Sequence, residues 1–143
     1  MEINQMTISD LEEIKETLTT NFDDFWSYSC FKSELENPKS TYFVARLNNQ
    51  IVGFAGIWEA VDDIHITNIA VNKDFRKQGI ASQLLEKLIE TAKSKNTISL
   101  TLEVNCKNVA AIHLYEKYNF SRLGTRKKYY NGTDDAYIMT LFF

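Results

Sequence analysis

The stretch between residues 64 and 104 constrains this chain more than any other, because it combines two strand patterns with a long amphipathic helix. Seven apolar residues recur with a period near 3.6 from Ile80 to Ala92, and charged residues occupy the opposite face, which predicts a helix with one buried side. Residues 64–71 are expected to form the strand before it, and residues 98–104 alternate apolar and polar side chains as the strand after it. A strand–helix–strand unit of this kind requires a parallel strand pair with a right-handed crossover.

Turn signals predict antiparallel hairpins on either side of this unit. Asn48-Asn49 can take the positive φ angles of a tight hairpin turn, and Asn131-Gly132 is a stronger signal of the same kind. The strands that these turns join are expected over residues 42–47, 50–59, 120–130 and 136–142.

Three further helices are expected outside the central unit. A capping box at Ser9-Asp10-Leu11-Glu12 predicts the start of the first helix, and Pro38 ends a second one that begins near residue 26. A third is expected over about 108–118. The fold class is therefore α/β (α+β), with residues 1–143 forming one domain. Its sheet should be mixed and mostly antiparallel, with a central parallel β-α-β pair and helices on both faces.

Composition excludes several classes of protein. A chain of 143 residues with 44% hydrophobic residues is long enough for one packed domain, and it is neither a disordered tail nor a disulfide scaffold. The net charge of −3 provides no overall basic field for nucleic acid. Two distant cysteines and two histidines give no metal-binding pattern. Without a signal-peptide pattern at the start or an apolar run of about 20 residues, we expect a cytoplasmic protein with no membrane partner.

The turn before the long helix has the features of a phosphate-binding site. Gly79 lacks a Cβ and allows close approach of a ligand, while the backbone amides from Gln78 to Ser82 face outward at the positive end of the helix dipole. The local charge is +2, from Lys73, Arg76 and Lys77 against Asp74. This arrangement favours a phosphorylated ligand, specifically a pyrophosphate.

An ordinary glycine-containing turn with a solvated charge cluster is the alternative interpretation of the same residues. The nucleotide-binding patterns GxxxxGK[ST] and GxGxxG are absent from the chain, so the sequence offers no support for a nucleotide triphosphatase or a dinucleotide dehydrogenase.

The same segment carries a family resemblance. Arg76-Lys77-Gln78-Gly79-Ile80-Ala81 resembles the (R/Q)xxGxG/A signature of the GNAT superfamily of N-acetyltransferases, and residues 102–105, Asn108 and 110–117 resemble its second cofactor segment. The resemblance covers almost the whole chain. It is closest to the ribosomal-protein-alanine N-acetyltransferases, because Glu103, Tyr115 and the tail over 126–139 recur in that subgroup's pattern.

The resemblance implies acetyl-CoA as the co-substrate, with no metal ion. In the family the strand before the turn carries a bulge that frees main-chain groups, so the Ile69 and Val71 amides would meet the oxyanion. Asn108 would contact the cofactor, although a plain helix N-cap is an equal alternative. The cofactor-binding residues implied are Ile69, Ala70, Val71, Arg76, Lys77, Gln78, Gly79, Ile80, Ala81, Ser82, Asn108 and Tyr115.

Two residues are candidates for catalysis of direct acetyl transfer. Glu103, on the polar face of a predicted strand, would act as general base through a water molecule; its alternative is a surface acid paired with a lysine such as Lys107. Tyr115 would act as general acid toward the leaving thiolate; its alternative is a core aromatic residue. An acetyl-cysteine at Cys106 is not favoured, because no histidine is placed by sequence to activate it.

The acceptor is expected between the early helices and the last hairpin. Trp26, Tyr129 and Tyr130 would frame a slot for an extended peptide N-terminus with a small first residue such as alanine, including that of a ribosomal protein, and Asp134 or Asp135 would attract the cationic amine. Two alternatives stay open: an acetyltransferase for a small amine (a polyamine, amino acid or antibiotic), and a non-catalytic acyl-CoA-binding module. The oligomeric state, monomer or weak dimer, is not determined by the sequence.

Overall fold

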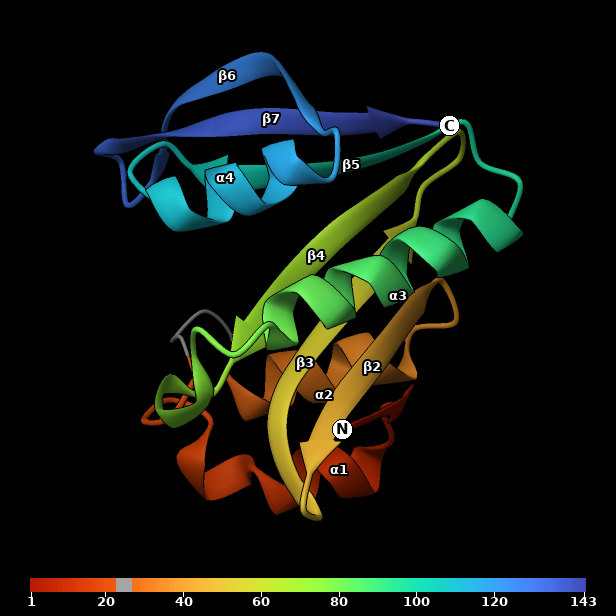
Figure 1. Ribbon diagram of the computed structural model, residues 1–143, viewed down its shortest axis with the longest axis vertical. Helices are drawn as coiled ribbons and strands as arrows, with labels where there is room; N and C mark the ends of the chain where they lie inside the picture. The colour runs from red at the N-terminus through yellow and green to blue at the C-terminus, as the bar shows by residue number, and fades with distance from the viewer. Residues whose placement is uncertain (23–26) are drawn as a thin grey trace.

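One mixed β-sheet carries the architecture (Figure 1). The computed structural model describes residues 1–22 and 27–143. Over these residues the sheet has seven strands in the order β1-β2-β3-β4-β5-β7-β6, and β4 and β5 are its parallel pair. The predicted fold class is therefore confirmed. The strands are β1 (Glu2–Gln5), β2 (Ser40–Leu47), β3 (Gln50–Glu59), β4 (Ile64–Val71), β5 (Ser99–Asn105), β6 (Ser121–Tyr130) and β7 (Asp134–Phe142).

Helices cover both faces of the sheet. Leu84, Leu85 and Leu88 of the long helix α3 are fully buried in one core, to which α4 also contributes, while Leu11 and Phe31 anchor α1 and α2 in a second core on the opposite face. None of the described helices is both long enough and apolar enough to cross a bilayer. The helices are α1 (Ile8–Glu13), the 3₁₀ turn η1 (Lys15–Thr17), α2 (Tyr28–Glu36), the 3₁₀ turn η2 (Lys73–Phe75), α3 (Ile80–Ser94) and α4 (Val109–Lys117).

The predicted hairpin turns are confirmed. Asn48 and Asn49 both have positive φ angles, 51° and 65°, between β2 and β3. Asn131 and Gly132 also have positive φ, 53° and 69°, between β6 and β7. Both turns thus use residues that tolerate the left-handed region, which is what a tight hairpin requires.

The start of the first helix differs from the prediction, and β1 was not predicted at all. Thr7 caps α1 in place of Ser9: its Oγ1 accepts a hydrogen bond from the Asp10 N–H, and Asp10 Oδ2 accepts one from the Thr7 N–H. Asp10 also pairs with Arg46 of β2 at 2.7 Å, so a tertiary contact favours this cap. The edge strand β1 is short and mostly exposed, and it therefore lacks the apolar alternation by which strands are recognised.

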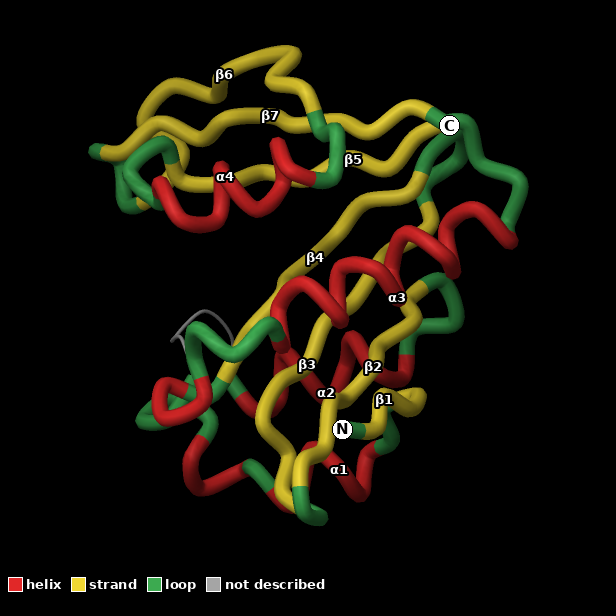
Figure 2. Tube along the Cα trace, in the orientation of Figure 1, coloured by secondary structure: helices red, strands yellow, loops and turns green. Residues whose placement is uncertain are grey.

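Strands β4 and β5 pair only briefly and then separate (Figure 2). Their register contains two pairs, Ile64 with Leu100 and His65 with Thr101. Next to these pairs β4 carries a β-bulge, because Asn68 lies opposite Gly56 and Ile66 lies opposite Ile57, which leaves Thr67 as an extra residue. A bulge bends its strand and increases the local twist. It accounts for the opening between the two strands.

Tyr42 of β2 packs against this bulge. Its hydroxyl lies 2.6 Å from Thr67 Oγ1, and its ring is 2% exposed and lies directly over Gly56 of β3. A Cβ on Gly56 would be 2.3 Å from ring atoms of Tyr42. Gly56 is therefore required for space rather than for its backbone freedom.

We expect Gly56→Ala to lower the free energy of unfolding by about 2–3 kcal/mol, because a buried ring must shift to admit the methyl group. Urea unfolding followed by circular dichroism measures this. Gly124→Ala is the matched control: the nearest atom to its Cβ would be 3.4 Å away, so it should change stability little. Equal effects of the two substitutions would contradict the packing argument.

Candidate active site

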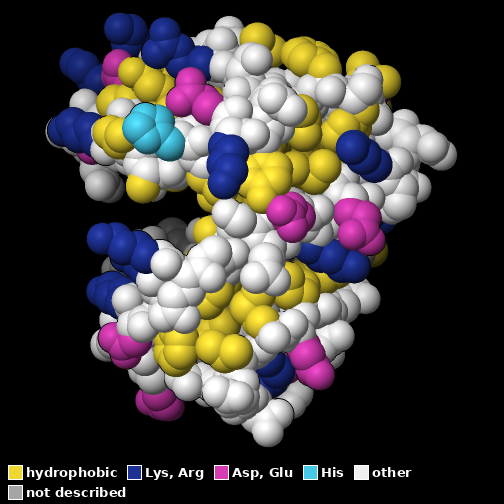
Figure 3. Space-filling view, in the orientation of Figure 1, with side chains coloured by type: hydrophobic (Ala, Val, Ile, Leu, Met, Phe, Trp, Pro, Cys, Tyr) yellow, Lys and Arg dark blue, Asp and Glu magenta, His cyan; other side chains and the backbone are white. Residues whose placement is uncertain are grey.

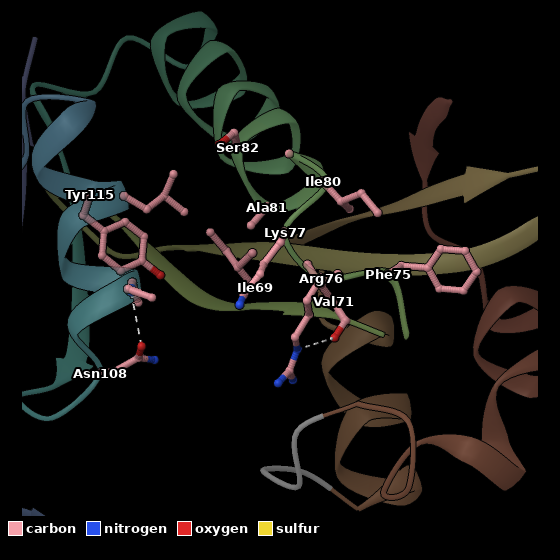
Figure 4. Close-up of a pocket in the computed structure, with 14 residues that line it drawn as sticks. Ile69, Val71, Phe75, Arg76, Lys77, Ile80, Ala81, Ser82, Asn108 and Tyr115 are labelled. Carbon is pink, nitrogen blue, oxygen red and sulfur yellow. Dashed lines mark hydrogen bonds between the residues drawn. The ribbon is translucent and has the colours of Figure 1, made fainter. Parts of the chain in front are cut away.

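A cavity of about 390 Å³ lies where β4 separates from the β5 side of the sheet (Figure 4). One wall is β4 with the turn that leads into α3, and the facing wall is the first part of α4. Figure 3 shows the molecule hollowed between its two halves, with Lys and Arg side chains gathered beside the hollow. The lining residues are Ile69, Val71, Phe75, Arg76, Lys77, Gly79, Ile80, Ala81, Ser82, Asn108, Ala110, Ala111, Leu114 and Tyr115.

The turn at one end of the cavity has the geometry of an anion site. Gly79 is the N-cap of α3 with φ +80°. Among the described residues, no side chain caps the helix and no atom lies within 4 Å of where a Cβ would be. The first amides of α3 therefore lack intrahelical partners and are aligned with the positive end of the dipole. Arg76 and Lys77 line the same end, and Arg76 Nε donates to the Val71 carbonyl at 3.3 Å.

The cavity brings together the predicted cofactor-binding residues, with two exceptions. Ala70 is 2% exposed and packs into the core beneath α1 and α2, because alternation along β4 turns it away from the cavity while its neighbours Ile69 and Val71 face it. Gln78 is exposed and does not line the cavity. The side chains of these two residues therefore do not line the cavity. The prediction for Gln78 concerned its backbone amide at the turn, and for both residues a contact with the cofactor stays a prediction.

Sequence reasoning missed four lining residues: Phe75, Ala110, Ala111 and Leu114. The last three belong to the segment that carries the second half of the family resemblance, and their small or apolar side chains gave no chemical signal of their own. Asn108 is the N-cap of α4, because its Oδ1 accepts a hydrogen bond from the Ala111 N–H at 3.2 Å, and it also lines the cavity. Its contact with the cofactor stays a prediction.

Tyr115 projects from α4 into the cavity (Figure 4). Its ring packs against Phe120, with centroids 5.8 Å apart. Burial, together with the neighbouring Tyr130, raises the pKa of Tyr115 to about 12. The hydroxyl is thus a protonated donor at neutral pH. The sequence left open whether Tyr115 is a core aromatic residue or a group that faces the ligand. In the structure its ring packs against Phe120 and the residue also lines the cavity.

Glu103 lies on the sheet face opposite α4. Its neighbours Leu102 and Val104 are buried in the α3 and α4 core, so alternation places Glu103 on the other side of β5. The carboxylate is 25% exposed, and its Oε1 lies 3.4 Å from Arg126 Nε of β6. Its Oε2 is buried and receives no hydrogen bond from any described residue. The alternative partner, Lys107, instead pairs with Asp134 at 2.8 Å.

Tyr130 lies near both candidate catalytic groups. Burial is the main cause of its raised pKa, and the charge of Glu103 and the neighbouring Tyr129 add to the rise. Tyr130 in turn contributes to the raised pKa of Tyr115. Glu103, Tyr130 and Tyr115 therefore share one electrostatic neighbourhood, although they come from three different elements.

The predicted acceptor residues have mixed placements. The rings of Tyr129 and Tyr130 meet edge to face at 5.1 Å, and the Arg126 guanidinium lies 5.4 Å from the centre of the Tyr129 ring. Asp135 is engaged locally: its Oδ1 accepts a hydrogen bond at 2.8 Å from the N–H of Lys128, which has φ 51°. Trp26 lies outside the described residues.

This hydrogen bond stabilises an irregular part of β6. Arg126 pairs with Ala136 and Tyr130 pairs with Asp134, so β6 uses more residues than β7 to cover the same distance. Asp135 thereby holds the bulged segment that presents the two tyrosines, a role that the sequence did not indicate.

Comparison with known proteins identifies the class. Residues 11–120 match the model of the acetyltransferase (GNAT) family. The chain belongs to this family, and the expectation of an acyltransferase is confirmed.

Individual relatives agree with the narrower resemblance. A Bacillus subtilis (strain 168) protein is 36% identical over 140 residues, which cover 96% of this chain and 92% of that protein. The [ribosomal protein bS18]-alanine N-acetyltransferase of Escherichia coli (strain K12) is 35% identical over 119 residues, 81% of this chain and 80% of that protein. A crystal structure of the ribosomal-protein-S18-alanine N-acetyltransferase from Escherichia coli superposes with a TM-score of 0.89 at 32% identity, covering 99% and 92% of the two chains.

The raised pKa of Tyr115 predicts a loss of stability at high pH. Between about pH 10, the ordinary pKa of tyrosine, and pH 12, the unfolded chain releases the proton while folded Tyr115 retains it. The unfolded state then binds fewer protons, so the free energy of unfolding falls as the pH rises, by at most about 2.7 kcal/mol over this window. Urea unfolding between pH 9 and 12 should show a shallower decline for Tyr115→Phe than for the wild type; parallel declines would contradict the assignment.

Proposed function

We propose that this protein transfers an acetyl group from acetyl-CoA to the α-amine of a peptide N-terminus that begins with alanine, as in a small-subunit ribosomal protein. One observation carries the proposal: a single opening in the sheet has an uncapped helix N-terminus at one end, the Tyr115 hydroxyl in its wall and Glu103 on the adjoining strand. The names of the Escherichia coli relatives support the choice of acceptor, and their similarity spans most of this chain.

The residues of the cavity fit coenzyme A. Its diphosphate needs backbone donors and positive charge, which the first amides of α3, Arg76 and Lys77 would supply. Open space around Gly79 leaves room for that contact. Its amide-containing arm needs unpaired main-chain groups, and beyond His65 the edge of β4 that faces β5 has no paired strand among the described residues.

Bound acetyl-CoA supplies an acetyl group activated as a thioester. The α-ammonium group of a peptide has a pKa near 7.7–8.0, so much of it is charged at neutral pH and must lose a proton before it can attack. Glu103 would accept that proton through water. Backbone N–H groups of Ile69 and Val71 would stabilise the charge that develops on the carbonyl oxygen.

Tyr115 would stabilise the departing sulfur. Its pKa of about 12 lies above that of a thiol, about 8.5, so complete proton transfer to sulfur would be uphill by about 5 kcal/mol in the free enzyme. The hydroxyl therefore serves best as a hydrogen-bond donor to the sulfur while charge builds up on it. After the bond between sulfur and the acetyl carbon breaks, the thiolate would take its proton from solvent.

The acceptor would lie on the face that carries Glu103. Tyr129 and Tyr130, held by the Asp135 contact with Lys128, would border a peptide chain there, with Trp26 as a further contributor. Mass spectrometry of an alanine-initiated tripeptide incubated with enzyme and acetyl-CoA tests the proposal. A peptide that gains one acetyl group supports it; acetylation of spermine or free amino acids in its place would favour the small-amine alternative.

The coenzyme A site can be tested with two glycines of equal geometry. Gly79 and Gly132 both have positive φ, and no atom of a described residue lies within 4 Å of a Cβ at either position. Each Gly→Ala substitution should cost about 1 kcal/mol of stability, because alanine disfavours the left-handed region. Calorimetry should show about tenfold weaker coenzyme A binding for Gly79→Ala, because the added methyl group would occupy the space through which the diphosphate reaches the amides, and unchanged binding for Gly132→Ala. Equal coenzyme A affinities of Gly79→Ala and Gly132→Ala would show that the diphosphate does not bind at this turn.

Replacement of the proposed base should give a pH-dependent defect. Glu103→Gln should reduce kcat about 100-fold at pH 6.5, where the amine is charged, and less at pH 9, where free amine is available. Coenzyme A affinity should be unchanged, since Glu103 does not line the cavity. Glu90→Gln, at an exposed acid on α3, is the control for loss of one negative charge. A deficit that does not vary with pH would argue against proton removal by Glu103.

A further inference from the structure

Asn68 is a polar residue in an unusual position. It belongs to the β4 bulge, and both polar atoms of its side chain, Oδ1 and Nδ2, are buried. No described residue gives either atom a hydrogen bond of normal geometry. A buried carboxamide without partners is expensive, and such groups are usually satisfied by a ligand or an ordered water.

The face on which Asn68 lies follows from its neighbours. Thr67 bonds the Tyr42 hydroxyl, and the Asn68 amide is close enough to lower the pKa of Tyr42 against the larger rise that burial causes. The adjoining Ile69 turns to the other face, where it lines the cavity. Asn68 therefore points to the side of the sheet opposite α3.

Counted from the last parallel pairs, Asn68 and Glu103 lie a similar number of residues along their strands. The last parallel pairs join Ile64 to Leu100 and His65 to Thr101. Three residues beyond Leu100 lead to Glu103 on β5, and the same advance from Ile64 leads to the Thr67–Asn68 bulge on β4. Glu103 also faces away from α3 and α4, and its Oε2 is likewise buried without a hydrogen bond from any residue that the structure describes.

The Asn68 carboxamide and Glu103 Oε2 thus lie on the same face, on the two strands that part here, and no described residue gives either group a hydrogen bond of normal geometry. One is a carboxylate oxygen that accepts hydrogen bonds, and the other is a carboxamide that both donates and accepts. Water is the small molecule that satisfies both groups at once in a buried site. We propose that Asn68 is a positioning residue that holds, together with Glu103, the water through which Glu103 takes the proton of the acceptor amine.

This inference rests on the proposed function, and it assigns Asn68 a task separate from acetyl-CoA binding. The proton moves from the amine nitrogen to the water oxygen, and a proton of that water moves to the Glu103 carboxylate, so the water is regenerated. The Asn68 carboxamide fixes the water and undergoes no change in protonation.

The decisive experiment compares two substitutions with the alanine-initiated tripeptide as acceptor. Asn68→Leu keeps the volume of the side chain and removes its polarity, whereas Asn68→Ser loses volume and keeps a donor and acceptor. We expect kcat at pH 6.5 to fall about tenfold in Asn68→Leu and less in Asn68→Ser, with KM for the peptide and the affinity for coenzyme A within twofold of wild type. A packing role for Asn68 would give the opposite order, and that result would overturn the proposal.

A double substitution tests whether the two residues act on the same proton path. Because Glu103→Gln already disables that path, adding Asn68→Leu should change kcat less than twofold; multiplication of the two single effects would overturn the proposal. Tyr42→Phe is the structural control. It removes the hydroxyl beside Thr67, so it should lower the unfolding midpoint without the pH-dependent loss of kcat. A Tyr42→Phe enzyme that reproduces the pH profile of Asn68→Leu would assign the effect to the bulge and not to the water.

The outcome for the wild type separates the two proposals. If the wild-type enzyme acetylates the peptide and Asn68→Leu matches it at every pH, the inference about Asn68 is wrong while the proposed function stands. If the wild type acetylates neither the peptide nor spermine, the proposed function fails and the inference fails with it.

Discussion

The separation of β4 from β5 is the constraint on which the rest of this molecule depends. Two parallel pairs hold the strands together at one end, and the bulge at Thr67 turns β4 away beyond them. Without this separation, β4 would present paired backbone and no cavity. The Tyr42 hydroxyl and the space left by Gly56 stabilise the bulge from the opposite face. The binding surface on one side of the sheet therefore relies on packing on the other.

The candidate functional groups around this opening lie on both faces of the sheet. The cavity-facing side combines the uncapped start of α3 with Tyr115, while the opposite side carries Glu103 and Asn68. A donor and an acceptor substrate could thus approach from different directions and meet where the strands part. Tyr130 lies near both sides, since the charge of Glu103 adds to the rise in its pKa and Tyr130 adds to the rise in the pKa of Tyr115.

Two residues that the sequence analysis assigned to the site have side chains with structural contacts. Asp134 or Asp135 was expected to attract an amine, which stays a prediction, and the Asp135 carboxylate also accepts a hydrogen bond from the Lys128 N–H and holds the β6 bulge. Ala70 was expected near the cofactor, but alternation on β4 turns its methyl group into the α1 and α2 core. Neither contact was predicted, because a family pattern identifies a segment, whereas the pleat of the strand decides which side chains in that segment face the site.

The sequence alone determined the features whose causes lie within a few residues of one another. Asn48-Asn49 and Asn131-Gly132 form the hairpin turns because they tolerate positive φ, and Gly79 begins α3 because an apolar stripe of period 3.6 follows a residue without a Cβ. The tertiary structure alone decided where polar groups are left without partners and which of two capping boxes is used. Those outcomes depend on contacts between residues far apart in the sequence, such as Tyr42 with Thr67 and Arg46 with Asp10. A local sequence pattern cannot predict them, because these residues meet only when the chain folds.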